Sequence, residues 1–264
     1  MLCYHALSHR WDADLSTTPA RFTGQVAFLL KRGYRPARFS DVVRAPMRSG
    51  LLSVTFDDAF RSVFTEAAPI LARLGVPGTL FVPTDYIDSG GPLAWDGIDH
   101  WLDGPSANEL QPMSWDEIRQ LATAGWEIGS HTASHPRLTS VSDKQLADEL
   151  TQSKAVCERE LEGPCTSIAY PYGDLDASVV ASAGAAGYTT AASLPSVFHF
   201  GDPLQWPRIG VYHLDDDRRF RLKVSMAMMR LRRTGVWNAV KAAQGTAWSR
   251  YKRGRAVNQE DRTT

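Results

Sequence analysis

The chain has 264 residues, of which 43% are hydrophobic and 22% are charged, and its formal net charge is zero. This is a globular composition that fits one large domain or two small ones, and no stretch approaches the ~18 apolar residues that a membrane span needs. The neutral total hides an uneven distribution. Residues 1–217 carry 16 Lys and Arg against 27 Asp and Glu, whereas residues 218–264 carry 13 against two.

Short apolar runs alternate with helical patterns along the chain. The apolar runs are candidate strands, at residues 2–5, 51–56, 78–83, 126–130, 166–170, 188–193 and 206–211. The helical patterns lie between them, at residues 17–33, 114–125, 142–163 and 176–187. The first helix has Thr18 as a candidate N-cap with Pro19 after it, and Ser114 and Glu117 have capping-box spacing in the second.

Seven strands that alternate with helices predict an α/β fold with a parallel sheet, and their continuous apolar runs suit burial on both faces. An open doubly wound sheet and a closed barrel both satisfy this pattern. The segment 84–113 is long for a connection and carries Trp95 and Trp101. Such a segment either builds a ligand site or packs as a surface excursion.

The cysteines and the N-terminus indicate the compartment. Cys3, Cys157 and Cys165 are odd in number and form no C-x-x-C pair, so we expect no disulfide framework and a reducing environment. The first residues contain neither a basic region nor an apolar region of a signal peptide. The sequence therefore predicts a cytoplasmic protein.

Polar side chains follow three of the candidate strands. Asp57 and Asp58 end the run "VTFDD", His131 and His135 follow the run at 126–130, and Tyr172 lies in a Pro-Tyr-Gly turn. Adjacent carboxylates at the end of a buried strand repel each other, and a turn or a helix N-cap is the ordinary explanation. Their joint placement with two histidines four residues apart favours a metal site instead, because strand ends of a parallel sheet meet at one edge.

These motifs resemble a known family. "TFDD" (55–58), "SHTASH" (130–135) and "YPYG" (170–173), in this order, are similar to motifs of the polysaccharide deacetylase family, the NodB-homology domain of carbohydrate esterase family 4. The opening "LCYHALS" (2–8) is similar to the start of many members, and the resemblance covers roughly residues 1–212. It implies a distorted (β/α)7 barrel, TIM-like and NodB-type, that removes acetyl groups from N- or O-acetylated sugars with a divalent metal.

The resemblance also implies roles for individual residues. The metal ligands would be Asp58, His131 and His135, with Asp57 as general base and Thr132 bracing the histidine turn. The backbone N–H of Tyr172 would donate to the oxyanion. A divalent metal activates water and polarises a carbonyl, and a nearby carboxylate takes the proton of that water. Two imidazoles and one carboxylate suit Zn²⁺, with Co²⁺, Ni²⁺ and Mn²⁺ as alternatives.

The chain departs from the family pattern at two positions. Many members have an arginine two residues before the Pro-Tyr-Gly triplet, where this chain has Ala169; Arg208 on the last candidate strand is a substitute that would steady Asp57, or it makes an ordinary surface ion pair. Many members also have a late histidine as general acid. His213 matches that position poorly and also reads as a solvated turn, and His5 either lines the pocket or packs.

The segment 218–264 lies outside the resemblance and forms a second unit beside the barrel of residues 1–217. It has no acidic residue from Arg218 to Asn258, and it includes Trp237, Trp248 and Tyr251 at loosely helical spacing. A basic amphipathic helix suits an anionic membrane surface, here the inner membrane face. The alternative is a helix that packs on the acidic body of its own chain. Nucleic acid is not the expected partner because no recognition module accompanies the charge.

We therefore interpret the chain as a metal-dependent N-deacetylase of an acetylated carbohydrate, either a polysaccharide or a lipid-linked glycan precursor. Two alternatives stay open. One is a hydrolase of non-sugar amides on the same scaffold. The other is a membrane-associated carbohydrate-binding module with little or no turnover, which the missing arginine and the doubtful acid favour. The complete set of Asp57, Asp58, His131 and His135 argues against that module.

Overall fold

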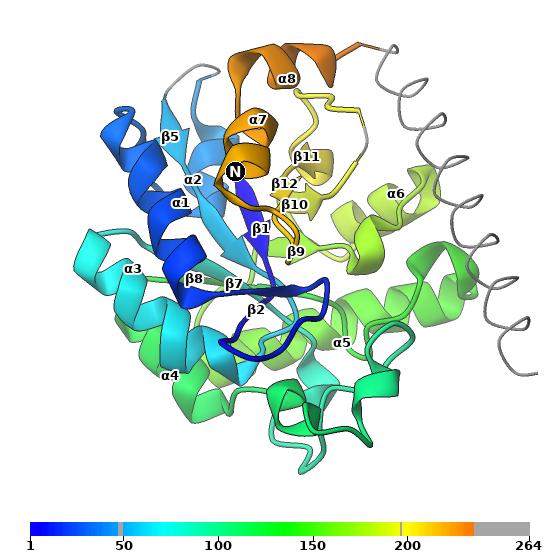
Figure 1. The fold of residues 1–264 in the computed structure, drawn as a ribbon. Helices are drawn as coiled ribbons and strands as arrows, with labels where there is room; N and C mark the ends of the chain where they lie inside the picture. Colours follow the sequence, from blue (N-terminus) through cyan, green and yellow to red (C-terminus); the bar gives the residue numbers. More distant parts are fainter. Residues whose placement is uncertain (47–49, 196, 235–264) are drawn as a thin grey trace, which may run out of the picture.

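The computed structural model describes residues 1–46, 50–195 and 197–234, and its centre is a parallel sheet (Figure 1). The strands of this sheet follow the spatial order β11 (Trp206–Pro207), β10 (Thr190–Ser193), β9 (Ser167–Ala169), β8 (Glu127–Ser130), β7 (Gly78–Val82), β6 (Val54–Phe56), β1 (Leu2–Tyr4) and β12 (Ile209–Gly210). Only Arg208 separates β11 from β12 in the chain. One stretch therefore pairs with β10 on one side and with β1 on the other, and the sheet closes.

Helices surround the sheet, and two small parallel sheets lie beside it. The helices are α1 (Pro19–Lys31), α2 (Phe39–Arg44), α3 (Ala68–Leu74), α4 (Trp115–Thr123), α5 (Asp143–Leu161), α6 (Ala177–Ala185), α7 (Asp217–Lys223) and α8 (Met226–Leu231). The small sheets pair β2 (Ala6–Leu7) with β3 (Ser16–Thr17), and β4 (Arg35–Pro36) with β5 (Leu51–Leu52). Thr18 caps α1, and Ser114 and Ser142 form capping boxes at α4 and α5.

The predicted barrel is confirmed, and the open sheet is excluded. Each of the seven predicted strands is present, although the last one is split at Arg208. Sequence reasoning missed α2 and the helix after the aspartate pair, which starts as a π-helical turn at Val63–Ala67 and continues as α3. Pro69 lies just after the π-helical turn, where a proline interrupts the hydrogen bonds of a regular α-helix.

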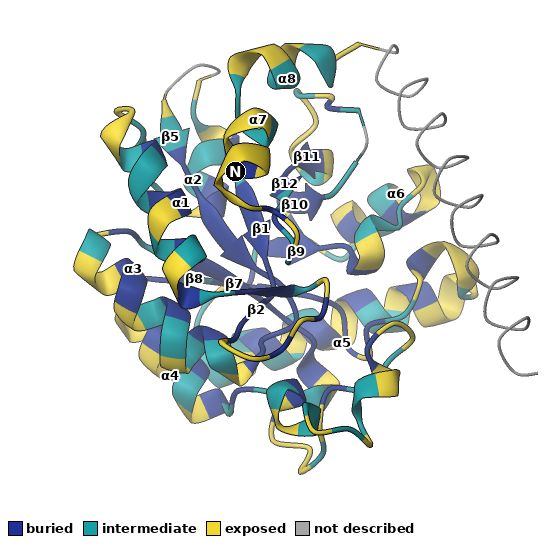
Figure 2. Ribbon diagram, in the orientation of Figure 1, coloured by how far each residue is buried: buried dark blue, intermediate teal, exposed yellow. Residues whose placement is uncertain are grey.

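The barrel strands are buried on both faces, as continuous apolar runs predict, although buried threonine and serine side chains also occur along them. Neighbouring residues of one strand belong to different buried clusters: Leu80 packs in the large cluster between the sheet and the helices, whereas Phe81 packs in a small cluster with Trp206. Figure 2 shows the strands as the buried centre of the molecule. Polar side chains within the strands bond to one another, as Ser167 does to Glu127 and Thr190, whereas the aspartates and histidines follow the strand ends.

The described part of the basic segment packs against the barrel. Phe220 of α7 is buried in the large cluster, and Lys223 pairs with Asp215 at 2.5 Å. Arg232 after α8 donates a hydrogen bond to the carbonyl of Pro195 and stacks over Phe198. Residues 235–264, which include the aromatic residues of the predicted tail, lie outside the described residues. Among the described helices, none is long and apolar enough to cross a membrane.

Candidate metal centre and active site

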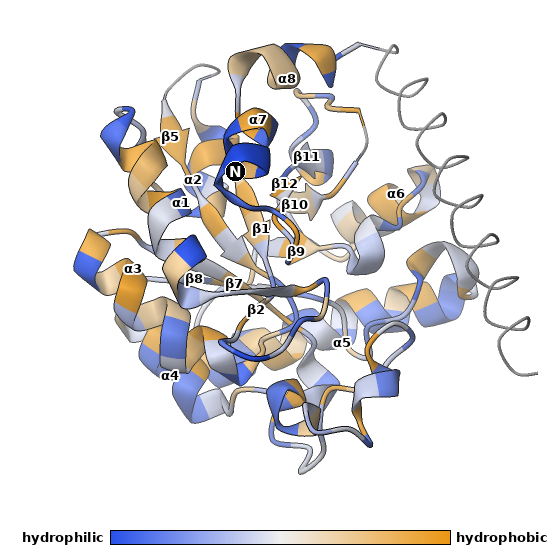
Figure 3. Ribbon diagram, viewed as in Figure 1, coloured by the Kyte–Doolittle hydropathy of each residue, from blue (hydrophilic) through white to orange (hydrophobic). Residues whose placement is uncertain are grey.

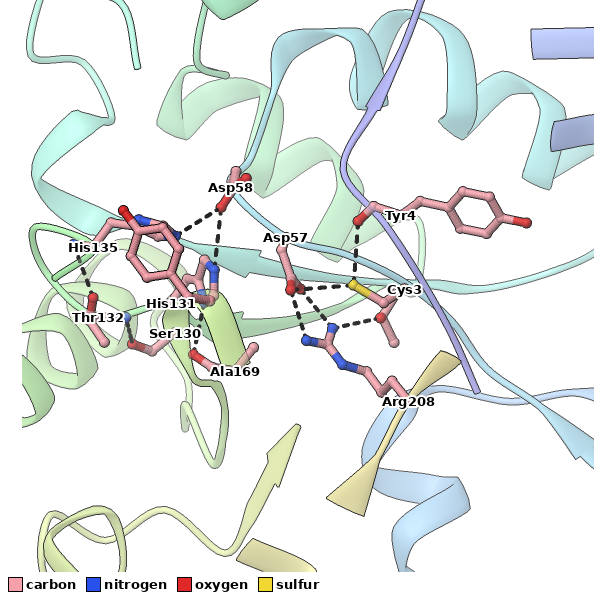
Figure 4. Close-up of polar contacts among 12 residues, drawn as sticks. Cys3, Tyr4, Asp57, Asp58, Ser130, His131, Thr132, His135, Ala169 and Arg208 are labelled. Atoms are coloured by element: carbon pink, nitrogen blue, oxygen red, sulfur yellow. Dashed lines mark hydrogen bonds and ion pairs between the residues drawn. The ribbon is translucent and has the colours of Figure 1, made fainter. Parts of the chain in front are cut away.

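Three buried side chains converge beyond the carboxyl ends of β6 and β8 (Figure 4). The Oδ1 atom of Asp58 lies 3.3 Å from Nε2 of His131 and 3.3 Å from Nε2 of His135. Each of the three residues is at most 5% exposed, and their ligand atoms all lie within 4.8 Å of one another. The structure thus brings together the three residues that the sequence predicts as metal ligands.

Unusual backbone conformations place these side chains. Asp58 (φ 71°), Thr132 (φ 69°) and His135 (φ 60°) adopt left-handed conformations without being glycine. Each such residue costs on the order of 1 kcal/mol or more and persists where the surrounding structure holds it, which is frequent at functional sites. Here the Oγ1 atom of Thr132 accepts the N–H of His135 at 3.1 Å, and the N–H of Thr132 donates to Oγ of Ser130 at 3.0 Å. Thr132 therefore makes the contact that a bracing role requires.

The donor set fits a divalent cation. Nδ1 of His131 lies 2.8 Å from the carbonyl oxygen of Ala169, which only accepts hydrogen bonds, so Nδ1 carries the proton and Nε2 presents its lone pair to Asp58. Asp58 Oδ1 is buried and makes no hydrogen bond of good geometry, although two imidazoles adjoin it. An ionised oxygen and an imidazole oriented by a carbonyl are typical of metal ligands.

Asp57 lies beside this cluster and pairs with Arg208 (Figure 4). Both Asp57 oxygens accept a hydrogen bond at 2.7 Å from the guanidinium, which also donates to Oγ1 of Thr55 at 2.8 Å. Burial raises the pKa of Asp57, but the charge and hydrogen bonds of Arg208 together with the nearby His131 and His5 outweigh burial, and the pKa of Asp57 is lowered. Arg208 is only 1% exposed, so the alternative of a surface ion pair is wrong. The guanidinium comes from the break between β11 and β12, not from the position of Ala169.

Cys3 is a neighbour of Asp57 that sequence reasoning did not assign to the site. Its Sγ atom lies 3.4 Å from Oδ2 of Asp57 and donates to it. Burial raises the pKa of this thiol well above its usual value, so the thiol keeps its proton and remains a donor. The sequence carried no local signal for this contact, because it depends on the pairing of Cys3 with Thr55 of β6, two residues before Asp57.

A cavity of about 310 Å³ opens above the aspartates and histidines. Its lining includes His5, the aspartate pair and both site histidines, together with wall residues that the sequence did not single out: Asp14, Leu15, Asp96, Gly97, Ile98, Leu194 and Tyr212. The segment 84–113 serves both of its predicted uses. Trp95 lines the cavity and stacks on His135 with ring centroids 4.1 Å apart, whereas Trp101 packs edge-on against Trp11.

Tyr172 stands at the rim of this cavity. It has a left-handed conformation (φ 58°) inside the turn Pro171–Gly173, and its ring lies 4.7 Å from that of His135. Its hydroxyl donates to the carbonyl of Asp96, and the Arg137 guanidinium lies 4.2 Å from its ring centroid. The turn therefore faces the candidate metal centre, and the segment 84–113 packs against it.

The two other candidate histidines differ in position. His5 lines the cavity and stacks loosely on Tyr212, and its buried Nδ1 atom makes no hydrogen bond in the described part of the chain. His213 lies outside the cavity lining, where its backbone bonds to Asp14 and to Arg21. Of the two, only His5 faces the cavity that holds Asp57 and Asp58.

Comparison with known proteins agrees with this site. The family model described as polysaccharide deacetylase matches residues 44–191, more than half of the chain. This chain belongs to the polysaccharide deacetylase family. The resemblance that the motifs indicated is therefore confirmed, and the matched range contains Asp57, Asp58, both site histidines and Tyr172 but not Arg208.

Several members of the polysaccharide deacetylase family are similar in sequence or fold. A chitooligosaccharide deacetylase of Bradyrhizobium sp. (strain ANU 289) is 30% identical over 167 residues, 62% of this chain and 63% of that protein. The poly-beta-1,6-N-acetyl-D-glucosamine N-deacetylase of Staphylococcus aureus (strain N315) is 26% identical over 184 residues, which are 64% of this chain and 58% of that protein. The chain thus spans less than two thirds of these relatives. The solved Streptococcus pyogenes deacetylase PplD shares the fold, with a TM-score of 0.70 at 19% identity over 85% of this chain and 96% of that chain.

Proposed function

We propose that this chain is a metal-dependent carbohydrate N-deacetylase, which hydrolyses an N-acetyl group on a sugar to acetate and a free amine. The observation that carries the proposal is the cluster of Asp58, His131 and His135 directly beside the buried Asp57–Arg208 pair, in one cavity. Family membership supports the reaction class. The complete cluster also argues against a binding module without turnover.

In this proposal Asp58, His131 and His135 hold the cation. Two imidazoles and one carboxylate form a common three-ligand set of catalytic zinc sites, which keep one position open. When bound, a divalent cation supplies Lewis-acid activation of water and of the acetyl carbonyl. Zinc suits these ligands best, with cobalt, nickel and manganese as alternatives.

Asp57 acts as the general base and Arg208 as its positioning residue. The lowered pKa of Asp57 keeps its carboxylate ionised at neutral pH, so it can take the proton of the attacking water. The bidentate contact with Arg208 fixes the plane of that carboxylate. The backbone N–H of Tyr172 is the proposed donor to the oxyanion that forms as water adds to the carbonyl.

The leaving amine needs a proton, and Asp57 is its proposed source. His5 faces the same cavity, but burial lowers its pKa below the usual value, so it is neutral at neutral pH. A neutral imidazole is a poor acid, although it can hydrogen-bond to the substrate. Asp57 gains a proton when water attacks and returns that proton to the amine, which balances the reaction.

The proposed substrates are glycans of N-acetylglucosamine, because the relatives are named for chitooligosaccharide and for poly-beta-1,6-N-acetyl-D-glucosamine. The test is acetate release by the zinc-loaded chain from β-1,4- and β-1,6-linked oligosaccharides of N-acetylglucosamine, with simple N-acetyl amides in parallel. Release from a glycan alone supports the proposal. Release from the simple amides alone favours the non-sugar hydrolase, and glycan binding without release favours the binding module.

Loss of the Arg208 charge is expected to move the acidic limb of the pH–rate profile to higher pH. Arg208 lowers the pKa of Asp57, so the base is ionised down to low pH in the intact chain; in Arg208→Gln the pKa rises and protonation disables the base earlier. The change also leaves a buried carboxylate unpaired, at a stability cost of about 3–5 kcal/mol. Arg208→Lys keeps the charge and serves as the matched variant.

The measurement is kcat/KM against pH for both variants, with thermal unfolding as a fold check. We expect a clear upward displacement of the acidic limb for Arg208→Gln and a smaller one for Arg208→Lys. If the acidic limb of the kcat/KM profile lies at the same pH in the intact chain and in a folded Arg208→Gln variant, the positioning role of Arg208 is refuted.

A further inference from the structure

The outer surface of α7 and α8 combines exposed apolar side chains with arginines. Among the described residues, the large hydrophobic side chains classed as exposed are Tyr172, at the cavity rim, and Leu214, Leu222 and Met226, which are 61%, 58% and 59% exposed. The last three lie within one short stretch. Around them lie exposed arginines at positions 218, 219, 221, 230 and 233. We call these eight residues the α7–α8 surface.

Figures 2 and 3 show this surface from outside. The outward side of α7 is exposed, and both hydrophilic and hydrophobic residues occur along it; α8 continues the exposed surface at the edge of the barrel. Phe220 points the other way, into the core. One face of α7 is therefore anchored, while the opposite face leaves Leu222 in solvent.

The arginines of this surface are not neutralised by the acidic body of the chain. Among the described residues, none of these five arginines forms an ion pair with a carboxylate. The acidic residues that precede α7 are engaged locally: Asp215 pairs with Lys223, and Asp216 caps the helix. No acidic residue occurs from Arg218 to Thr234. The packing of a basic helix on its own acidic body, the alternative from the sequence, does not account for this positive charge.

We propose that the α7–α8 surface docks on an anionic lipid bilayer. Arginines near a bilayer are attracted by anionic headgroups, and exposed leucine and methionine side chains gain by entering the boundary of the acyl chains. Nucleic acid would bind the arginines through its phosphates, but it would gain nothing from the exposed apolar side chains of Leu214, Leu222 and Met226. The combination of both residue types within residues 214–233 favours lipid. This inference is independent of the deacetylase proposal, because docking requires no turnover.

The α7–α8 surface extends along the barrel: Leu214 follows Tyr212, which lines the catalytic cavity, whereas Met226 begins α8. Val224 and Met229, from the end of α7 and from α8, line an apolar cavity together with Met1 and Leu2, at the amino-terminal end of β1. Asp58 and the site histidines lie at the opposite, carboxyl end of the parallel strands. The α8 end of the surface therefore lies away from the catalytic cavity, whereas Leu214 lies two residues after a residue that lines it.

The test is sedimentation of the full chain with vesicles. Vesicles of phosphatidylglycerol mixed with phosphatidylcholine are compared with vesicles of phosphatidylcholine alone, at low and high salt. The charge variant is Arg218→Glu with Arg230→Glu, and its matched control is Arg73→Glu with Lys144→Glu, two exposed positions on other helices. A third variant, Leu222→Ser with Met226→Ser, removes apolar contacts without changing charge. Thermal unfolding checks that each variant folds.

The expected result is salt-sensitive binding of the intact chain to the anionic vesicles only. Reversing Arg218 and Arg230 weakens this binding at least about tenfold, the control pair much less, and the serine variant reduces the binding that survives high salt. Equal binding by the charge variant and its control would overturn the proposal, as would an intact chain that does not bind anionic vesicles. Binding to mixed-sequence nucleic acid in place of vesicles would overturn it too.

Discussion

Asp57→Asn is expected to reduce acetate release from an N-acetylated oligosaccharide by about 10²–10⁴-fold, the usual contribution of a positioned general base. Asparagine has nearly the same shape, so it fills the space between Arg208 and Cys3, but it cannot take a proton from water. Asp57 lies outside the group of Asp58, His131 and His135, so a metal held there should remain; Asp57 belongs to a second group of possible ligand atoms, with Cys3 and His5. The measurement is kcat with saturating substrate, beside the zinc content of the same preparation.

The control for this change is Asp99→Asn, which alters an exposed carboxylate outside the cavity lining. It should leave kcat within about twofold, as surface substitutions generally have small effects. An Asp57→Asn variant that is folded, retains zinc and turns over at the rate of the intact chain would contradict the assignment of the base. Loss of both zinc and activity would instead make Asp57 part of the metal site.

His131→Ala is expected to weaken zinc binding by more than roughly 100-fold, because loss of a direct ligand exceeds the 10–100-fold cost of losing a residue that only orients a ligand. It removes one of two imidazoles and also the orienting bond to the carbonyl of Ala169. At low zinc concentration this variant should bind less zinc, and its activity should fall accordingly. Competition with a chelating dye measures the affinity.

The matched control is His100→Ala, because that side chain is exposed and outside the cluster. Its zinc affinity should equal that of the intact chain. His135→Ala provides a second test of the same cluster and should resemble His131→Ala. Unchanged zinc affinity in both cluster variants would show that the metal binds elsewhere, and the Asp58 cluster would lose its proposed role.

The barrel was predictable from the sequence because strands and caps are local signals. Each apolar run became a strand, and Ser114 with Glu117 forms the predicted capping box. The helix at α3 was missed because it begins with an irregular turn at Val63–Ala67 and has Pro69 near its start. The choice between an open sheet and a barrel depended on how residues 206–210 pair at both edges, which is not a local property.

Most of the predicted site residues lie in motifs, and Arg208 was predicted as the partner of Asp57 only through the family resemblance. Asp57, Asp58 and the histidines follow strand ends, so the edge they share was visible. The contact of Arg208 with Asp57 joins positions 151 residues apart and depends on closure of the barrel. Cys3 and the cavity wall near Asp96 carry no motif, and their roles come from packing alone.

The site departs from the family pattern at Ala169, but an arginine from another strand, Arg208, contacts Asp57 instead. Arg208 reaches Asp57 from the broken strand, and Ala169 contributes its carbonyl to His131 instead. The base therefore keeps a bidentate partner. In the proposed reaction Asp57 carries the proton from water to the leaving amine, so the reaction requires no second acid.

Cytoplasmic localisation and the unit boundary after residue 217 stay predictions. The described basic segment contacts the barrel through Phe220 and Arg232, but residues 235–264 lie outside the described residues. The vesicle variants at Arg218 and Arg230 test the described surface within the full chain.

The central claim is that the Asp58 cluster holds a metal that acts on an acetylated glycan. The most direct measurement is acetate release from a chitooligosaccharide and from a β-1,6-linked oligosaccharide of N-acetylglucosamine, by chain stripped of metal and then titrated with zinc. The account predicts background release without metal and recovery that saturates at about one zinc per chain. Release that persists fully in the stripped chain, or no release from either glycan by chain that has bound one zinc, would contradict it.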